Sequence, residues 1–112
     1  MTDAVKKRLH DALRACETIL TFVDGVCFGA YERDLLLRFP VERQLEIIGE
    51  ALGRAADRDD SLEEQVPAIP RIVALRNRVI HGYDNVDDEI VWDIVQNKVP
   101  AVREQIKKLL KR

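Results

Sequence analysis

The central helix of this chain is predicted by residues 41–56, which read VERQLEIIGEALGRAA. The apolar side chains recur at three- and four-residue steps, which places them on one face of an α-helix; they are Val41, Leu45, Ile48, Leu52 and Ala55. Gly49 lies inside this stretch, where a glycine costs up to about 1 kcal/mol relative to alanine. Its presence predicts close packing of this helix against another surface, and we expect a second copy of the chain to be that surface.

The residues before this helix predict one more long helix and one short one. Over residues 3–23 the same spacing recurs, and the charged side chains fall largely on the opposite, solvated side; the apolar positions are Val5, Leu9, Ala12, Cys16, Ile19, Leu20 and Val23, and the charged ones include Lys6, Lys7, Arg8, Asp11 and Arg14. Gly25 and Gly29 indicate a loop. A short helix over residues 31–38 is expected to end before Pro40, which suits the first turn of the next helix.

The residues after the central helix predict two further helices. Ser61 and Glu64 form a capping-box pattern for a single turn, and a helix beginning near Pro70 is expected to stop at Gly82. The acidic turn of residues 84–89 suits the start of a last helix. The apolar positions of that helix are Val91, Ile94, Val95, Val99, Val102, Ile106, Leu109 and Leu110, and Pro100 predicts a kink near residues 96–99.

This pattern predicts an all-α fold, a four- to five-helix up-and-down bundle, in a single domain that spans residues 1–112. The 112 residues are 46% hydrophobic and 34% charged, which supports one modest core. No run of about 18 apolar residues predicts a membrane span, and the N-terminal residues lack the apolar stretch of a secretory signal. We therefore expect a cytoplasmic protein.

Charge and cysteine content exclude several classes of function. The net charge of −2 argues against a dedicated binder of duplex DNA, although it leaves room for a local basic patch. Cys16 and Cys27 are eleven residues apart and form no CxxC pair, so a zinc site or a disulfide framework is not expected. We interpret both as small apolar residues and expect neither a metal nor a cofactor.

The groups that carry chemistry gather in residues 71–83, which read RIVALRNRVIHGY. Arg71, Arg76, Arg78 and His81 occur here without an acidic residue between them, so this segment should attract anions, and the planar guanidinium suits phosphate. His81 can transfer protons near neutral pH. Together with Tyr83, and without a catalytic serine motif, this set favours phosphodiester chemistry in which the 2′-hydroxyl of RNA supplies the nucleophile.

Helix geometry limits how these groups can converge. Arg76 and His81 are five positions apart, about 140° around a straight helix, whereas Arg78 and His81 share a face. Either the end of the helix is distorted or a second subunit completes the site. The only other histidine, His10, is far away on the first helix, so chemistry with two imidazoles needs two copies of His81 in a symmetric homodimer. A basic run at a helix end can also be a solvated face.

Three blocks of sequence resemble one family. The string Arg76-x4-His81-x-Tyr83 resembles the Arg-x4-His-x-Tyr motif of HEPN domains, specifically the HepT-like ribonuclease toxins of type VII toxin–antitoxin systems. Residues 45–51, LEIIGEA, and residues 75–83, LRNRVIHGY, resemble segments of that family, and residues 88–92, DEIVW, resemble the start of its last helix. The resemblance covers nearly the whole chain in the same order.

The resemblance implies a dimeric helical bundle whose two motifs face each other across a cleft and act as a metal-independent RNA endonuclease. Arg76 would bind and polarise the scissile phosphate, His81 would act as general acid or base, and Tyr83 would contact the phosphate. A minimal nucleotidyltransferase would be the cognate antitoxin and would adenylylate Tyr83. Messenger RNA and transfer RNA both remain open as substrates.

Other roles and readings stay open at this point. Asn77 and Arg78 could orient RNA, and Glu46 and Glu50, four residues apart on one helix face, could hold the arginines in place or simply be solvated. A second hypothesis is a non-catalytic module that docks a nucleotidyltransferase or presents a nucleotide to it. A third is a purely structural helical dimer, which would bury Arg76 and His81 in satisfied contacts.

Overall fold

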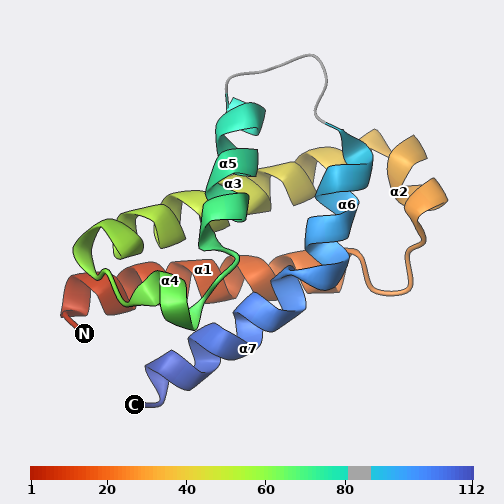
Figure 1. Cartoon of the computed structure of the whole chain (residues 1–112). Helices are drawn as coiled ribbons and strands as arrows, with labels where there is room; N and C mark the ends of the chain where they lie inside the picture. Colours follow the sequence, from red (N-terminus) through yellow and green to blue (C-terminus); the bar gives the residue numbers. More distant parts are fainter. Residues whose placement is uncertain (81–86) are drawn as a thin grey trace.

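The frame of the fold is a pair of long antiparallel helices. The structure is a computed structural model that describes residues 1–80 and 87–112. Helix α1 (Asp3–Phe22) and helix α3 (Leu35–Arg58) pack against each other along most of their lengths, and the short helix α2 (Phe28–Arg33) lies between them in the sequence (Figure 1). The all-α prediction is confirmed.

The remaining helices cover this pair. After the single turn α4 (Leu62–Gln65), helix α5 (Ile69–Ile80) crosses α3, and helix α6 (Asp88–Asn97) stands beside α5 in Figure 1. Helix α7 (Val99–Leu110) returns along α1. The radius of gyration is 13.6 Å, close to the value of about 13 Å expected for a compact chain of roughly 100 residues.

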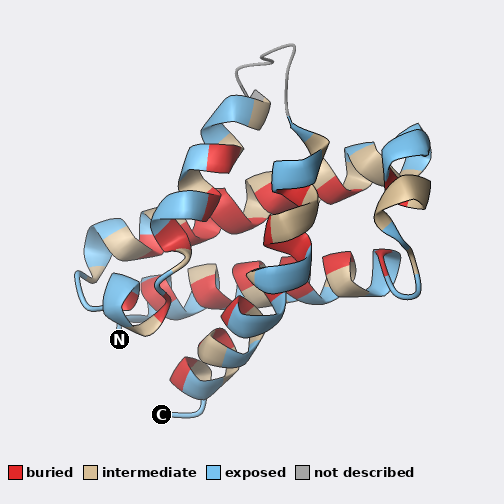
Figure 2. Ribbon diagram, turned by 45° about the vertical axis from the view of Figure 1, so that its right-hand side comes forward, coloured by how far each residue is buried: buried red, intermediate tan, exposed pale blue. Residues whose placement is uncertain are grey.

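The core forms where the predicted apolar faces meet. Figure 2 shows the buried positions as stripes along the helices, turned toward the interior of the bundle. The five apolar positions predicted for the central helix are all buried, as are the first five predicted for α1. No polar or charged residue in the described parts of the chain belongs to the fully buried class. The hydrophobic periodicity therefore assigned the inner faces correctly.

Gly49 has a packing partner within the same chain. A Cβ atom added at this position would lie 2.6 Å from Cβ of Arg76 and 2.9 Å from its Cγ. Such distances are impossible for real atoms, so the absence of a side chain lets α5 cross α3 at this point. The glycine therefore gives no support to the expectation of a second copy at this position, because α5 already fills the space.

The boundary between α2 and α3 differs from the prediction. We expected a short helix over residues 31–38 and a new helix after Pro40, but α2 ends at Arg33 and α3 is continuous through Pro40. The side chain of Asp34 caps α3 by accepting a hydrogen bond from the amide of Leu36 at 3.0 Å. Pro40 lies in the second turn, where its missing amide affects only the exposed first turn of the helix. Gly29, expected in a loop, lies in α2.

The last predicted helix is two helices. Instead of a kink near residues 96–99, the chain ends α6 at Asn97 and begins α7 at Val99, with Pro100 in the first turn of α7. Proline has no amide to continue the hydrogen bonds of α6, but it is well tolerated in the first turn of a new helix. The described parts of the chain thus hold five helices of ten or more residues and two short ones.

The remaining features of the fold are the length and apolarity of its helices and the surroundings of the two cysteines. None of the described helices is both long and apolar enough to cross a membrane. Cys16 is buried, and burial raises the pKa of its thiol to about 12, whereas Cys27 is exposed just before α2.

Candidate functional site

Arg76 of α5 is held against α3 by the carboxylate of Glu50. Its Nη2 donates a hydrogen bond to Oε2 of Glu50 at 2.5 Å, and its Nη1 donates to Oδ1 of Asn77 at 3.0 Å. The helix crossing at Gly49 brings the start of the arginine side chain against α3, one residue before Glu50. Local packing and the ion pair therefore fix the position of Arg76 together.

Glu50 is shared by two arginines. Arg54 Nε donates to Oε1 of Glu50 at 2.7 Å, on the other side of the carboxylate from Arg76. The hydrogen bond from Arg54, with the nearby charges of Arg54, Arg76 and Arg8, holds the pKa of Glu50 below its ordinary value. The carboxylate is therefore ionised at neutral pH, and the guanidinium groups around it exceed its single negative charge.

Arg76 retains hydrogen-bonding capacity. A guanidinium carries five N–H groups, and only two of those in Arg76 have the acceptors named above. Its Nε is buried and has no hydrogen-bond partner within the described residues. The remaining donors of an arginine suit the paired oxygens of a phosphate.

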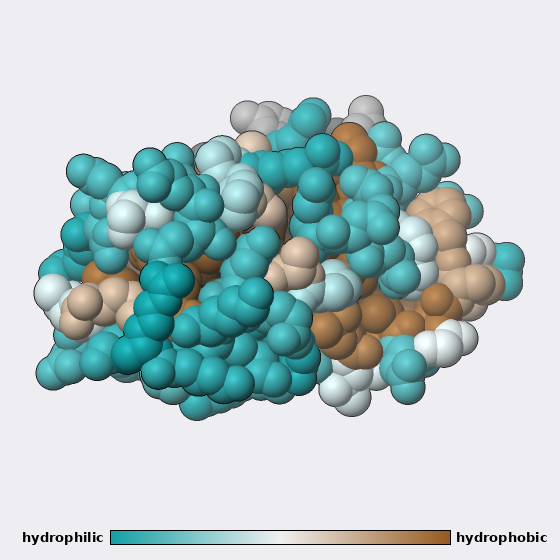
Figure 3. All heavy atoms as spheres, turned by 60° about the horizontal axis from the view of Figure 1, so that its bottom comes forward, coloured by the Kyte–Doolittle hydropathy of each residue, from teal (hydrophilic) through white to brown (hydrophobic). Residues whose placement is uncertain are grey.

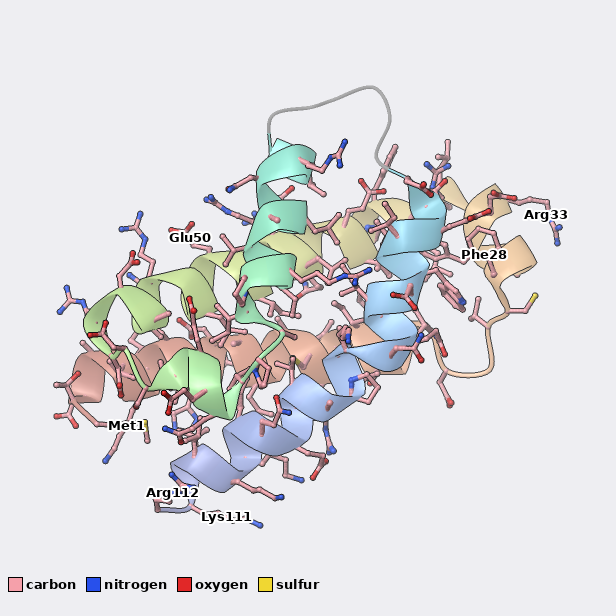
Figure 4. All side chains as sticks on the ribbon, in the orientation of Figure 1. Met1, Phe28, Arg33, Glu50, Lys111 and Arg112 are labelled. Carbon is pink, nitrogen blue, oxygen red and sulfur yellow. The ribbon has the colours of Figure 1, made fainter. Side chains whose placement is uncertain are left out.

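A groove of about 500 Å³ opens beside the Arg76–Glu50 pair, between α1 and α3. Figure 4 shows Glu50 on α3 close to where α5 crosses it, far from Arg33 on α2. Three further arginines line the groove, Arg8 and Arg14 from α1 and Arg43 from α3. The sequence pattern of α1 placed its arginines on a solvated face, because that pattern alone does not show that the charged side borders a groove.

Arg78 faces a different part of the molecule. It lines a second cavity of about 430 Å³ between α5 and α6, together with Arg71, Leu75, Ile90 and other residues of these two helices. The run of arginines in α5 therefore divides between two faces of the helix. Arg76 lines the first groove and donates a hydrogen bond to Asn77, whereas Arg78 lines the second cavity.

The two predicted supporting carboxylates have different partners. Glu50 pairs with Arg76, whereas Glu46 lines the same groove and pairs with Arg43 at 3.0 Å. His81 and Tyr83 lie outside the described residues. Their roles, like those of Arg76, Asn77 and Arg78, remain predictions.

A second polar cluster, not predicted from the sequence, holds the start of α6. Nη2 of Arg38 lies 3.2 Å from Oδ2 of Asp88, and both side chains are largely buried. The hydroxyl of Tyr31 and the second oxygen of Asp88 are buried without a partner in the described residues. Desolvation by burial, opposed by Arg38, raises the pKa of the nearby Glu42. The only sequence signal was the position of Asp88 in an acidic turn.

Comparison with known proteins identifies the family. Residues 12–109 match the family described as ribonuclease HepT-like. The chain belongs to the HepT-like ribonuclease family. This result confirms the resemblance carried by the motif and the two flanking blocks.

Curated relatives support the same assignment. The HepT-like chain is 33% identical over 104 residues to a protein of Methanocaldococcus jannaschii named as a candidate RNase, covering 91% of this chain and 93% of that one. It is 32% identical over 106 residues to a protein of Thermococcus cleftensis named a probable ribonuclease HepT, covering 95% and 96%. A candidate RNase of Caldanaerobacter subterraneus is 30% identical over 104 residues, covering 93% and 92%. No solved structure matches this HepT-like chain.

Proposed function

We propose that this protein is a metal-independent RNA endonuclease, the toxin of a toxin–antitoxin pair, whose active site forms at the cleft of a homodimer. The observation that carries this proposal is the placement of Arg76 by Glu50 and Gly49 at the mouth of an arginine-lined groove, five residues before His81. Membership of a ribonuclease family and an arginine positioned beside an anion-attracting groove both support cleavage of a phosphodiester bond.

The proposed reaction is an internal transfer at phosphorus. His81 of one subunit removes the proton of the RNA 2′-hydroxyl, and the 2′-oxygen attacks the adjacent phosphorus. The bond to the 5′-oxygen breaks, and the partner copy of this histidine protonates that oxygen. The products carry a 2′,3′-cyclic phosphate and a 5′-hydroxyl. Arg76 and Tyr83 contact the phosphate oxygens, where charge builds up in the transition state.

Glu50 acts as a positioning residue in this scheme. The guanidinium of Arg76 reaches the phosphate in a fixed orientation because Glu50 and Asn77 hold two of its donors. Asn77 therefore acts through Arg76, and Arg78, which lines a separate cavity, contacts RNA beyond the scissile phosphate.

The partner in the pair is a minimal nucleotidyltransferase acting as the antitoxin. Transfer of an adenylyl group to the hydroxyl of Tyr83 releases pyrophosphate from ATP and adds a bulky anion next to Arg76 and His81. The added phosphate competes with RNA for the same arginine, which explains how a single modification would neutralise the toxin. Messenger RNA and transfer RNA are both compatible with this scheme.

The test compares two histidine variants. Purified wild type, His81→Ala and His10→Ala are incubated with cellular RNA in EDTA, and mass spectrometry verifies that Tyr83 carries no adenylyl group. His10 is the matched control because it is exposed on α1 and does not line the groove. We expect wild type and His10→Ala to leave 2′,3′-cyclic phosphate ends and His81→Ala to leave the RNA intact. Equal cleavage by His81→Ala would contradict the mechanism.

A second candidate function is a docking module for the nucleotidyltransferase. Large apolar side chains are exposed near the start of α3 and the end of α1, namely Phe22, Leu35, Leu36 and Phe39, and Leu36 is 89% exposed. Figure 3 shows hydrophobic residues gathered toward the end of the molecule that carries α2, while the opposite end is mainly hydrophilic. Unmodified wild type that binds the nucleotidyltransferase but never cleaves RNA would favour this reading.

A further inference from the structure

The arginines of the α1–α3 groove are more numerous than its carboxylates can neutralise. Four arginines and three acids line the groove, and each acid already has a cation: Asp11 pairs with Lys7, Glu46 with Arg43, and Glu50 with both Arg54 and Arg76. The lining therefore has an excess of one positive charge in a chain whose net charge is −2, and Lys7 and Arg54, which lie outside the lining, pair with Asp11 and Glu50 in addition.

Arg8 and Arg14 contribute most to this excess. Neither has an ion-pair partner within residues 1–80 and 87–112, and Arg14 is exposed while Arg8 is partly buried. Arg8 lines the same groove as Arg76 and Glu50, and its charge contributes to lowering the pKa of Glu50. The positive surface therefore extends from Arg76 onto α1 and does not end at the proposed active site.

The shape of the groove suits a strand and not a single small anion. Its α1 wall runs from Arg8 to Thr18, ten residues or about 15 Å along the helix axis. This length is several times the axial rise of roughly 3.4 Å per phosphate in a duplex strand, so even a more extended single strand places more than one phosphate along it. Small residues, Ala15 and Ala51, line the groove between the arginines and leave space for a backbone to approach.

We infer that this groove binds the phosphate backbone of single-stranded RNA next to the scissile phosphate, with Arg8 and Arg14 as phosphate contacts. The inference rests on the proposed ribonuclease function and adds the path that the substrate follows away from Arg76. Phosphate contacts of this kind set the affinity and register of a strand and carry no base preference. We therefore expect the affinity of the groove to depend on the length of the RNA and not on its sequence.

The experiment measures binding without cleavage. In a His81→Ala background, the double variant Arg8→Gln/Arg14→Gln is titrated with a single-stranded RNA of about twelve nucleotides and with one of about three nucleotides. The matched control is Arg33→Gln/Lys108→Gln, which removes the same charge from exposed positions on α2 and α7. Figure 4 shows the side chain of Arg33 pointing away from the molecule.

We expect the groove variant to bind the longer RNA at least about tenfold more weakly than the control, with a smaller loss for the shorter one. Loss of two phosphate contacts should reduce the slope of log affinity against log salt by about 1.4, because each contact on a single strand contributes roughly 0.7. Equal affinities and slopes for groove and control variants would overturn the inference. So would a groove variant that becomes monomeric while the control stays assembled, because the groove would then be a protein interface.

The two proposals can fail separately. If wild type cleaves RNA but the groove and control variants bind it equally, the nuclease stands and the groove does not. If wild type never cleaves but RNA binding depends on Arg8 and Arg14, the groove stands as a binding site and the nuclease mechanism does not. Circular dichroism and thermal unfolding of each variant check that the fold is retained.

Discussion

Helix α3 is joined to its neighbours by two arginine–carboxylate pairs, and the ratio of arginines to carboxylates differs between them. Glu50 of α3 binds Arg76 of α5, and Arg38 of α3 binds Asp88 of α6. Arg76 lies before residues 81–86 in the sequence and Asp88 lies after them, so described residues on both sides of His81 and Tyr83 pair with the same helix.

The charge ratios of the two clusters are reversed. At the first, one carboxylate is shared by two arginines, Arg54 and Arg76. At the second, one arginine, Arg38, faces two carboxylates, Asp88 and Glu42. The first lies beside an open groove and has cationic capacity to spare for a ligand. Within residues 1–80 and 87–112, the second has no cation paired with Glu42.

The carboxylate of the second pair is also more deeply buried than that of the first. The side chains of Arg38 and Asp88 are 24% and 17% exposed, against 27% and 36% for Arg76 and Glu50. The ring of Tyr31 packs at a tilt against Trp92, with ring centroids 4.9 Å apart, and burial raises the pKa of its hydroxyl. The comparison fits an anchor at Arg38 and the phosphate-binding role that we propose for Arg76.

The largest expected effect comes from removing the anchor. Arg38→Ala leaves Asp88 and Glu42 facing each other without a cation, and breaking a largely buried pair should cost about 2–4 kcal/mol of unfolding free energy. Urea unfolding measures this loss, with Arg33→Ala on the exposed face of α2 as the control. A loss no greater than that of the control would mean that the cluster is solvated and that the two pairs are alike.

The next effect concerns the crossing that positions Arg76. Gly49→Ala should cost about 1–3 kcal/mol, because the new methyl group forces α5 away from α3, and it should also lower RNA cleavage. Gly53→Ala is the matched control on the same helix. There the new Cβ would lie at an ordinary 3.4 Å from Val73, and the higher helix propensity of alanine adds up to about 1 kcal/mol of stability. Equal effects of the two substitutions would remove the packing explanation for Gly49.

The sequence was sufficient for the helical class and for the faces that the helices bury, but not for every helix boundary. Val41, Leu45 and Ile48 follow a period that only a helix matches, and burial of such a face is dictated by the hydrophobic effect. The division of α2 from α3 was not predictable from Pro40, because its missing amide affects only the exposed first turn of α3 and the cap of Asp34 decided the boundary.

The candidate site was predictable only in part. Arg76 stood out through its basic surroundings and the family motif, and Glu50 through its place on the central helix. The difference between Glu46 and Glu50 was not predictable, because it depends on where α5 crosses α3. Arg8 and Arg14 were assigned to a solvated face for the same reason: helix periodicity separates two sides of a helix but does not show which neighbour borders the polar side.

A smaller effect is expected when the carboxylate at Arg76 loses its charge. Glu50→Gln keeps the shape of the side chain but weakens its hold on the guanidinium, and a poorly positioned phosphate contact should lower kcat/KM by about tenfold to a hundredfold. At 1.4 kcal/mol per tenfold this corresponds to roughly 1.4–2.8 kcal/mol. Glu46→Gln removes the same charge one helical turn away and should lower kcat/KM less. Equal losses would indicate a general field effect and no specific role for Glu50.

The smallest expected effect concerns Glu42, the second carboxylate beside Arg38, and its contribution to stability. The pKa of Glu42 is raised in the folded protein, so the folded state holds its proton more tightly than the unfolded state does. The unfavourable contribution of Glu42 is absent below the unfolded pKa and appears as the pH rises through the folded pKa. Glu42→Gln should therefore be more stable than wild type at neutral pH, by less than about 1 kcal/mol because the group is partly solvated, and the difference should vanish in acid. Urea unfolding across this pH range measures the difference in unfolding free energy, with Glu63→Gln on α4 as an exposed control. Destabilisation at neutral pH would mean that Arg38 stabilises both carboxylates, and the contrast between the two clusters would then rest on burial alone.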